Sequence, residues 1–425
     1  MQFQLAYGKG TLNVELPEAN VVQCLGYQPA TPLADPTQTL QSLLFAPNGT
    51  PSLASLAAGK RSACIVISDR SRPVPNRILL PPILETLEAA GIARDTICIL
   101  VGTGLHPVIT PEEILEIVGP EIANRYSIVS HDARDEATNR RIGESPRGIP
   151  VVIDSRYLDA ELKILTGLIE PHFMAGYSGG RKSICPGIAG RETICTWHSP
   201  RFIEHENARF GKLDGNPIHE EAVFIARAAG CDFIVNAVID AERRILDIFA
   251  GDLEAAHRDG VTFARQLVTA TISEPVDIVV TSAAGYPLDN SWYQSIKGVV
   301  AALDILKPGG TIVLASACGG GIGNAEFEQI AAKFKTIDAF MEAIHGDFFI
   351  INQWQVEELA MALTKCKVRV VTGGLPPEVL SQYYVQPAAS VEAAVAEAMA
   401  EYGPNATIAV LPEGPYVLAE VARAE

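Results

Sequence analysis

The sequence predicts an α/β protein with two domains. From Arg61 onward, short β-branched runs alternate with amphipathic stretches, which is the pattern of strands joined by helices. The pattern restarts around residues 271–277, and a chain of 425 residues is long enough for two or three domains. We therefore expect two α/β domains with mainly parallel sheets, at residues 1–272 and 273–425, that enclose an active-site cleft between them.

Local patterns place the individual elements. The runs ACIVI at 63–67 and TICILV at 96–101 have the continuous apolar character of buried parallel strands. In the first domain, strands are expected at 63–67, 96–101 and 233–238, and helices at 79–90, 220–229 and 252–267. In the second domain, strands are expected at 278–281, 311–315 and 407–411, and helices at 292–305 and 388–402.

Composition and charge exclude several classes of protein. A formal net charge of −17 lacks the basic footprint of a nucleic-acid-binding protein, so no nucleic-acid partner is expected. No apolar stretch approaches the length of a membrane span, and the first residues lack a secretory leader pattern. The eight cysteines show no CxxC pair and no disulfide spacing, so we interpret them as buried thiols. These features predict a cytoplasmic protein with no membrane partner.

Two loops that follow predicted strands carry candidate site residues. Ligands of open α/β sheets bind outside the carboxyl ends of the strands, which places loops 68–75 and 102–107 at a site. The first loop contains Asp69 and Arg72, and an arginine can donate two parallel hydrogen bonds to a substrate carboxylate. The second loop contains His106. Taken alone, such a surface Asp-Arg pair is usually solvated, and a histidine beside a proline is usually structural.

The stretch from residue 167 to residue 199 concentrates histidines, glycines and positive charge. It reads GLIEPHFMAGYSGGRKSICPGIAGRETICTWHS. Its glycines can let backbone N–H groups approach a ligand closely, and Arg181 and Lys182 add charge for a phosphate or carboxylate. We expect Lys182 on a tight loop. The glycines in question are Gly176, Gly179 and Gly180.

A phosphate-binding loop is the nearest general pattern for this stretch, but the match is incomplete. The pattern GxxxxGK[ST] requires a second glycine where this chain has Arg181. A Gly-Gly-Arg-Lys segment by itself also fits an ordinary surface turn. Further along, His205 and His219 lack the spacing of a zinc site, so we do not expect them to bind a metal.

The second predicted domain adds candidates on one helix. If residues 292–305 form a helix, Gln294 and Lys297 are three residues apart and share a face near its N-terminus, next to Tyr293. Spacing alone favours a plain amphipathic helix with an exposed lysine. The glycine run CGGGIG at residues 318–323 lacks the spacing of a dinucleotide-binding fingerprint.

Five separated motifs, taken together and in order, resemble the signature of the nickel-dependent lactate racemase (LarA) family. The resemblance covers nearly the whole chain. The motifs are DRSRPVP with Asp69 and Arg72, GLH with His106, GYSGGRK with Lys182 between the flanking His172 and His198, YQSIK with Tyr293, Gln294 and Lys297, and NQW with Trp354.

The resemblance implies a cofactor and a role for each motif. In this family a lysine covalently carries a nickel-pincer nucleotide, a pyridinium-3,5-bisthiocarboxylic acid mononucleotide whose two sulfurs and ring carbon hold nickel. Lys182 would carry it, and His198 would complete the coordination of nickel. The implied acid/base residues are His106 and His172, and the implied substrate contacts are Arg72, Gln294 and Lys297. The implied further cofactor contacts are Asp69, Gly176, Ser178, Gly179, Gly180, Arg181, Tyr293 and Trp354.

The implied reaction is the racemisation of a small 2-hydroxy acid, with lactate the foremost substrate. One histidine takes the hydroxyl proton while the Cα hydrogen passes to the cofactor as hydride, and the planar 2-keto acid can regain hydride on either face. The enzymes that make the cofactor are implied as transient partners. Where the family continues His-Arg-Pro, this chain has Pro107 after His106, and Arg70 also departs from the lactate enzyme. Malate or a longer aliphatic 2-hydroxy acid therefore stays open as substrate.

Two functions of other classes also stay open. A phosphate-loop ATPase or kinase built on residues 176–183 would bind ATP with magnesium and would need no nickel. A catalytically silent nucleotide- or organic-acid-binding protein would show ligand-induced stabilisation without turnover.

Overall fold

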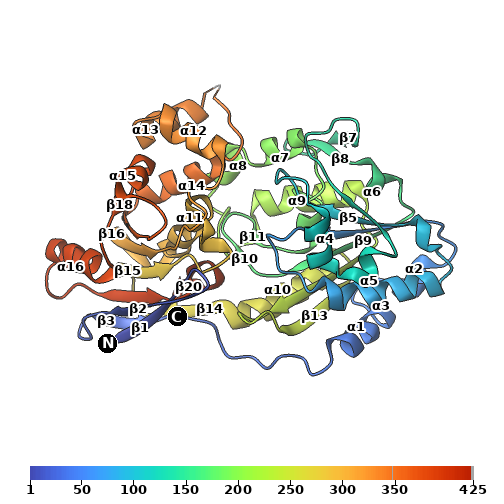
Figure 1. Cartoon of the computed structure of the whole chain (residues 1–425), viewed down its shortest axis with the longest axis horizontal. Helices are drawn as coiled ribbons and strands as arrows, with labels where there is room; N and C mark the ends of the chain where they lie inside the picture. Colours follow the sequence, from blue (N-terminus) through green and yellow to red (C-terminus); the bar gives the residue numbers. More distant parts are fainter. Residues whose placement is uncertain (347, 423–425) are drawn as a thin grey trace.

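Each half of the chain is built around a six-stranded sheet (Figure 1). The structure is a computed structural model, which describes residues 1–346 and 348–422. The first sheet has the order β13-β12-β9-β4-β5-β6, and the second has the order β18-β17-β16-β15-β19-β3. Neighbouring strands pair in parallel except β12 and β13, which are antiparallel. The predicted α/β class with mainly parallel sheets is therefore confirmed.

Each predicted strand is present, with ends that differ from the predicted ones by at most five residues. The first sheet consists of β4 (Ala63–Ser68), β5 (Ile97–Gly102), β6 (Ser127–Ser130), β9 (Leu162–Leu168), β12 (Phe233–Ile239) and β13 (Ile245–Gly251). The second consists of β3 (Val21–Cys24), β15 (Val276–Ser282), β16 (Leu306–Ala315), β17 (Lys367–Val371), β18 (Gln386–Pro387) and β19 (Ile408–Leu411). Four two-stranded pairs complete the set: β1 (Gln2–Tyr7) with β2 (Gly10–Glu15), β7 (Asn139–Glu144) with β8 (Pro150–Asp154), β10 (Pro171–His172) with β11 (Gly176–Tyr177), and β14 (Thr269–Ile272) with β20 (Leu418–Val421).

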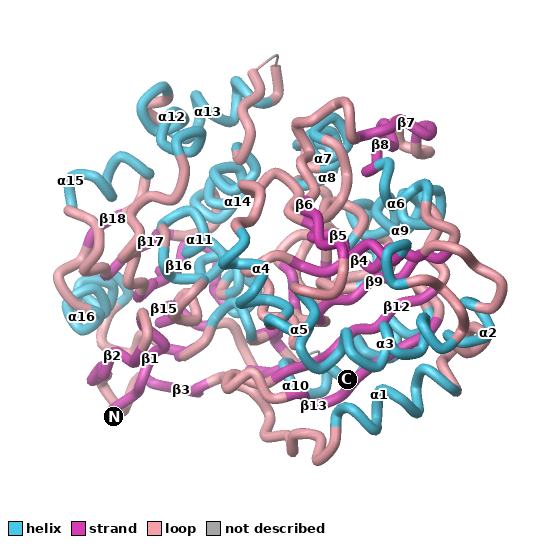
Figure 2. The backbone as a smooth tube through the Cα atoms, turned by 45° about the vertical axis from the view of Figure 1, so that its right-hand side comes forward, coloured by secondary structure: helices cyan, strands magenta, loops and turns pink. Residues whose placement is uncertain are grey.

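Helices cover both sheets. Those of the first half are α1 (Pro36–Phe45), α2 (Leu53–Ala57), α3 (Asn76–Ala89), α4 (Pro111–Val118), α5 (Pro120–Ala123), α6 (Ser155–Asp159), α7 (Arg191–Trp197), α8 (Pro200–Ile203), α9 (Pro217–Ala229) and α10 (Ala255–Val268). Those of the second half are α11 (Trp292–Ala301), α12 (Ala325–Lys333), α13 (Ile337–Ile344), α14 (Gln353–Leu363), α15 (Pro377–Leu380) and α16 (Val391–Tyr402). Figure 2 shows α3 and α5 on one side of strands β4, β9 and β12, with α6 and α9 on the other.

Every predicted helix is present, but three begin at other residues than expected, at Asn76, Pro217 and Val391. Two further ends differ for reasons that the local hydrogen bonds show. The helix expected at 252–267 begins at Ala255, because the Asp252 carboxylate accepts hydrogen bonds from the N–H groups of Glu254 and Ala255 and so lies before the first turn. The helix expected at 292–305 ends at Ala301. The N–H of Ala302 bonds back to Val299, which tightens the last turn before a 3-10 turn at Leu303–Ile305.

The alternation of side chains along β4 shows how the first sheet is buried on both faces. Ile65 and Ile67 pack into the cluster formed with α1, α2 and α3, whereas Cys64 and Val66 pack into the cluster on the opposite face with α7 and α9. Because both faces are covered, only the ends of the strands and their loops are free to build a site.

The N-terminal segment joins the second sheet rather than the first, which corrects the predicted assignment of residues 1–272 to one domain. β3 pairs in parallel with β19, and Leu5, Val14 and Leu16 of the β1–β2 hairpin share a core with strands β15, β16 and β19 and helix α16. Figure 1 shows the blue β1–β3 beside the orange and red elements of the second half. Strand pairing between residues so far apart leaves no local sequence pattern, so the predicted division missed it.

The cysteines are only partly buried. All eight are free thiols, and Cys64, Cys185, Cys318 and Cys366 are buried as predicted. Cys24 is exposed, because it lies on β3 at the edge of the second sheet, so the prediction of buried thiols is wrong there. Among the residues that the structure describes, no helix is both long and apolar enough to cross a membrane.

Candidate active site

A cavity of about 270 Å³ lies between the two halves of the chain. It opens at the carboxyl ends of β4, β5 and β9, where loops 68–75 and 102–107 were expected to contribute side chains. Helices α11 and α14 of the second half form the facing wall. The predicted residues that line it are Asp69, Arg72, His106, His172, Ser178, Gly179, Lys182, His198, Tyr293, Gln294, Lys297 and Trp354.

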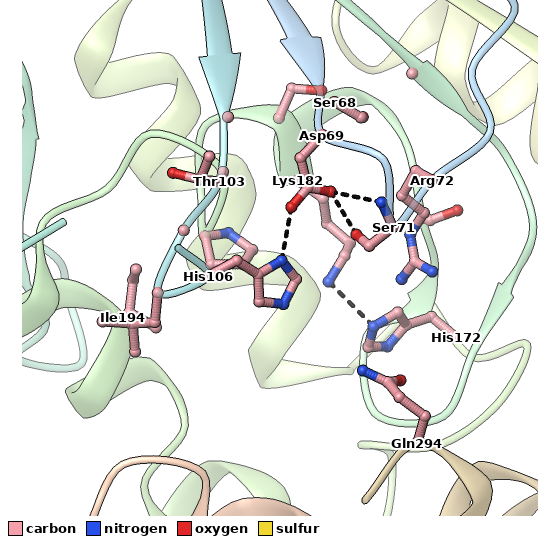
Figure 3. Close-up of a pocket in the computed structure, with 18 of the residues that line it drawn as sticks. Ser68, Asp69, Ser71, Arg72, Thr103, His106, His172, Lys182, Ile194 and Gln294 are labelled. Carbon is pink, nitrogen blue, oxygen red and sulfur yellow. Dashed lines mark hydrogen bonds and ion pairs between the residues drawn. The ribbon is translucent and has the colours of Figure 1, made fainter. Parts of the chain in front are cut away.

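His106 is held by a carboxylate at the cavity mouth. Its Nδ1 lies 2.7 Å from Asp69 Oδ2, and the Asp69 carboxylate also accepts hydrogen bonds from the backbone N–H and the hydroxyl of Ser71 (Figure 3). Although Asp69 is buried, these donors lower the pKa of its carboxyl group below the ordinary value. An ionised Asp69 makes Nδ1 the protonated nitrogen of a neutral His106, so Nε2 carries the lone pair. The His106 side chain is 53% exposed, so substrate can reach that nitrogen.

His172 lies deeper and among cations. Its Nε2 is 3.2 Å from Lys182 Nζ, and its Nδ1 accepts long hydrogen bonds from the N–H groups of Met174 and Ala175. Burial lowers the pKa of His172 well below its ordinary value, and the charges of Lys182, Arg72 and Lys297 lower it further. The imidazole is therefore neutral near pH 7.

Lys182 is a buried amine whose protonated form is disfavoured. It lies in the 3-10 turn Gly180–Ser183 (η2), which agrees with the expected tight loop, and its Nζ is 5.1 Å from the centre of the Trp197 ring. Burial and the nearby guanidinium groups of Arg72 and Arg181 lower the pKa of this amine well below its usual range. An uncharged amine is a nucleophile, so this lysine is suited to forming a covalent bond.

His198 presents a free nitrogen to the cavity. It lies just after α7, where its Nδ1 donates a hydrogen bond to the carbonyl of Ile194 at 2.8 Å. Among the described residues, Nε2 has no hydrogen-bond partner, and burial lowers the pKa of the imidazole to about 3. The ring stacks on Trp354 of α14 at a centroid distance of 4.3 Å, which links the two halves across the cavity. A neutral imidazole fixed through Nδ1, with Nε2 open, is the usual state of a metal-binding histidine.

The structure does not bring Gly176, Gly180 and Arg181 to the cavity. A Cβ at Gly176 would lie 2.2 Å from the carbonyl oxygen of Lys212, so this glycine is needed for packing. Arg181 is buried and donates hydrogen bonds to the backbone carbonyls of Ala175 and Tyr177, so its charge holds the loop together and does not face a ligand.

Three backbone N–H groups of this loop also donate hydrogen bonds within the protein. The N–H of Gly180 donates to Asn236 Oδ1, and the N–H of Ser178 donates to the carbonyl of Glu170. The N–H of Lys182 donates to the carbonyl of Gly179. The expected cradle of free N–H groups around an anion is therefore absent from these three positions.

The second half supplies a polar and aromatic wall. As the spacing predicted, Gln294 and Lys297 lie on one face of α11, where Lys297 Nζ donates to Gln294 Oε1 at 2.6 Å. The hydroxyl of Tyr293 donates to Asn352 Oδ1 at 3.1 Å, which ties α11 to the residue that precedes α14. Burial and Arg72 lower the pKa of the Lys297 amine to about 7.

A charged residue that the sequence did not single out lies beside the cavity, in a small pocket shared with Arg72 and Lys297. Glu170 lies on the segment between β9 and β10, and its Oε1 is 3.1 Å from Arg72 Nη1. The only available signal was a single acid within the otherwise apolar run GLIEPHF, two residues before His172. Arg70 differs from Arg72, because it is mostly exposed and pairs with Glu113 at the rim.

The two histidines discounted as metal ligands lie outside the cavity. His205 is exposed, and its Nδ1 accepts a hydrogen bond from the N–H of Asn207. His219 stacks on His257 at a centroid distance of 6.4 Å. Among the described residues, no group of three or more histidine, cysteine or acidic side chains is arranged to hold a metal ion. A metal bound at His198 would need its other ligands from a second molecule.

Comparison with known proteins identifies the family of the chain. The lactate racemase N-terminal domain matches residues 7–211, and the lactate racemase C-terminal domain matches residues 271–419. The lactate racemase of Thermoanaerobacterium thermosaccharolyticum is 34% identical over 98% of both chains, and that of Lactiplantibacillus plantarum is 36% identical over 96% of this chain and 97% of the relative.

Solved structures extend the comparison. The lactate racemase apoprotein from T. thermosaccharolyticum superposes with a TM-score of 0.94 over 99% of this chain and all of that one. A Thermotoga maritima protein at 16% identity, with a TM-score of 0.69 over 92% of this chain and 99% of its own, shares the fold alone. The resemblance read from the five motifs is confirmed, and the chain belongs to the lactate racemase family of isomerases.

Proposed function

We propose that this protein racemises lactate with a nickel-pincer nucleotide bound to Lys182. The observation that carries the proposal is that the Lys182 amine lies between two imidazoles, which come from different segments of the chain. Figure 3 shows His106, from the loop after β5, on one side of Lys182 and His172, from the segment after β9, on the other. Racemisation needs an acid/base group for each face of the substrate, and this cavity supplies two.

The residues present fit such a cofactor. Lys182 offers an amine with a lowered pKa for covalent attachment, and His198 offers an open Nε2 for nickel. One protein imidazole is enough if the nucleotide supplies the remaining ligands, in keeping with the lack of a larger ligand cluster among the described residues. When bound, the cofactor would accept and return the hydrogen of the substrate's Cα.

The two histidines would then handle only the hydroxyl proton. Asp69 holds Nδ1 of His106, so Nε2 is the atom that takes the proton from a substrate hydroxyl. Nε2 of His172 contacts the Lys182 amine at 3.2 Å, and conversion of that amine to an amide would free Nε2 for the substrate. The planar 2-keto acid formed in between can regain hydrogen on either face, which inverts the centre.

Arg72 and α11 would bind the substrate. The guanidinium of Arg72 suits a carboxylate because of its planar donor geometry. Lys297 and Gln294 lie together on the facing wall, where they can orient the oxygen as it changes from hydroxyl to carbonyl. Tyr293 and Trp354 bound the cavity with aromatic surface, which favours a small apolar substituent such as the methyl group of lactate.

A phosphate-loop nucleotide-binding function has less support. That function requires free backbone N–H groups around the phosphates, whereas those of Ser178, Gly180 and Lys182 are bonded within the protein. The charge of Arg181 is likewise used internally.

Intact mass and metal analysis test the proposal. The protein is made together with the enzymes that synthesise the cofactor, and its mass, nickel content and conversion of L-lactate to D-lactate are measured. We expect a covalent adduct in the parent and in the control Lys60→Arg, which alters an exposed lysine, but not in Lys182→Arg. His198→Ala should keep the nucleotide mass and lose nickel. Equal adduct in Lys182→Arg and the parent would overturn the attachment site, and malate turnover without lactate turnover would overturn the substrate.

A further inference from the structure

Glu170 is the carboxylate that lies beside Arg72 and Lys297, the two cations assigned above to the substrate. Its Oε1 lies 3.1 Å from Arg72 Nη1, and the two side chains are only 18% and 26% exposed. Among the described residues, no other carboxylate lies within ion-pair distance of Arg72, and none lies within that distance of Lys297. Asp69, the buried acid that lines the cavity, is bonded to His106 and Ser71.

The backbone of Glu170 is fixed, so its carboxylate has a defined position. Its N–H donates to the hydroxyl of Ser178 at 3.1 Å, and its carbonyl accepts from the N–H of Ser178 at 2.9 Å. Ser178 directly precedes the glycines that lead to Lys182. The same loop that presents Lys182 therefore also holds Glu170 against Arg72.

Positive charge otherwise dominates this part of the cavity. Arg72 and Lys297 each lower the pKa of Lys182 and of His172, and Arg72 also lowers the pKa of Lys297. Glu170, Arg72 and Lys297 line one small pocket together, so the carboxylate lies near both cations. Its charge acts in the opposite direction on Lys297, because it favours the protonated amine. Among the described residues, this contact at Nη1 is the one polar contact of the Arg72 guanidinium, so its other N–H groups are available to a ligand.

We propose that Glu170 is a positioning residue that holds Arg72 on the cavity wall and supplies the negative charge that keeps Lys297 a cation until the substrate's carboxylate arrives. The inference rests on the proposed assignment of Arg72 and Lys297 to the substrate. It adds a role for a residue that does not itself touch the reacting atoms. With Glu170 present, the substrate's carboxylate enters a site in which Arg72 and Lys297 are already in position. Without it, these two cations would be mobile and would repel each other.

The charge state of Lys297 can be measured without racemase activity. Trace acetic anhydride acetylates only the neutral amine, so the pH at which labelling of Lys297 is half-maximal reports its titration, and mass spectrometry reads that one site. Glu170→Gln removes the charge and keeps a hydrogen-bond acceptor for Arg72. In cofactor-free Glu170→Gln, we expect the midpoint for labelling of Lys297 to lie about 0.5 pH unit or more below that of the parent.

A matched variant controls for loss of an acid from the same region. Glu413 acts with Glu170 on Tyr27 and Tyr416, but it forms no ion pair with Arg72 among the described residues. Glu413→Gln should leave the Lys297 midpoint unchanged. If Glu170→Gln does not fold, Glu170→Asp, which withdraws the carboxylate by one methylene, should shift the midpoint in the same direction by less. A midpoint equal to that of the parent in the folded Glu170 variant would overturn the proposal.

Kinetics of the loaded enzyme separate a charge role from a merely structural one. In Glu170→Gln the KM for lactate should rise severalfold at pH 8.5 and stay within about twofold of the parent at pH 6, where Lys297 is a cation in both proteins. An equal rise at both pH values would mean that Glu170 acts only on local structure. Because labelling uses the unloaded protein, a failure of the racemase assignment leaves the Lys297 result unaffected.

Discussion

The regions around His106 and His172 hold the same side chain in opposite environments. His106 is half exposed at the cavity mouth and bonded to the ionised Asp69. His172 is buried, accepts hydrogen bonds from backbone N–H groups, and faces Lys182, Arg72 and Lys297. A carboxylate stabilises an imidazolium, whereas burial among cations opposes one.

This difference gives the proposed covalent attachment at Lys182 a second consequence, which concerns His172. The Lys182 amine contacts Nε2 of His172 at 3.2 Å, so in the proposed mechanism this nitrogen would be free for a substrate only after Lys182 has reacted. Acylation of Lys182 would remove an ionisable amine from the cluster and open the second. The proposed mechanism would therefore require the cofactor to bind before the substrate.

The largest expected effect is the loss of either histidine. His106→Ala and His172→Ala should each reduce turnover of the loaded enzyme by about a hundredfold or more in both directions, because every complete turnover passes both stereochemical half-reactions. Initial rates from pure D- and L-lactate measure this, with adduct mass and nickel content as controls for loading. Full activity in either variant would show that the two regions are not paired in the reaction.

A smaller loss should follow from Asp69→Asn, and it should depend on His106. Without the carboxylate, the Nδ1 proton of His106 is no longer fixed, and we expect turnover to fall by about tenfold to a hundredfold. In the His106→Ala background the same change should have little further effect, since Asp69 acts through that ring. If the two losses were additive in the double variant, Asp69 would not act through His106.

The smallest expected effect concerns stability in the region of His172. Lys182→Met should stabilise the cofactor-free protein by about 1 kcal/mol at pH 7, or roughly 2 °C in Tm, because it removes a desolvated amine near two guanidinium groups. The pKa of Lys182 is lower in the folded state than in the unfolded state, so the unfolded state binds more protons at neutral pH. The advantage of the variant should therefore shrink as the pH rises toward about 10.4, the unfolded pKa of lysine.

Thermal unfolding of cofactor-free protein between pH 7 and pH 10 measures this effect. Lys60→Met, at an exposed position of the same half, serves as the control and should leave Tm unchanged. A Lys182→Met variant that is less stable than the parent at pH 7 would show that the amine is well accommodated and that the cation cluster is not strained.

Much of this site could be predicted because its residues follow strand ends. Asp69 and His106 come directly after runs with a clear strand pattern, and parallel strands bring such loops together at one edge of the sheet. Likewise, the spacing of Gln294 and Lys297 was enough to place them on one face of a helix.

The remainder depends on contacts that no local pattern encodes. Gly176 and Arg181 were assigned to the ligand. At Gly176 a Cβ would lie 2.2 Å from a backbone carbonyl oxygen, but in the sequence such a glycine looks the same as one that a phosphate requires. The pairing of β3 with β19 joins residues at opposite ends of the chain, and the Arg72–Glu170 contact joins two loops. Such pairings are fixed by packing of the whole chain.

The fate of the hydrogen at Cα tests most directly whether the two histidines move only the hydroxyl proton. Lactate deuterated at Cα is converted by the loaded enzyme in ordinary water for a single turnover, and the product is analysed by mass spectrometry, with the 2-keto acid sought on rapid quenching. We expect the product to keep most of its deuterium and a small amount of 2-keto acid to be present, since hydrogen bound to carbon does not exchange with water. A proton taken from Cα by His106 or His172 would rest on nitrogen and exchange quickly. Extensive solvent hydrogen at Cα with no detectable 2-keto acid would contradict the proposal and indicate a two-base proton-transfer racemase.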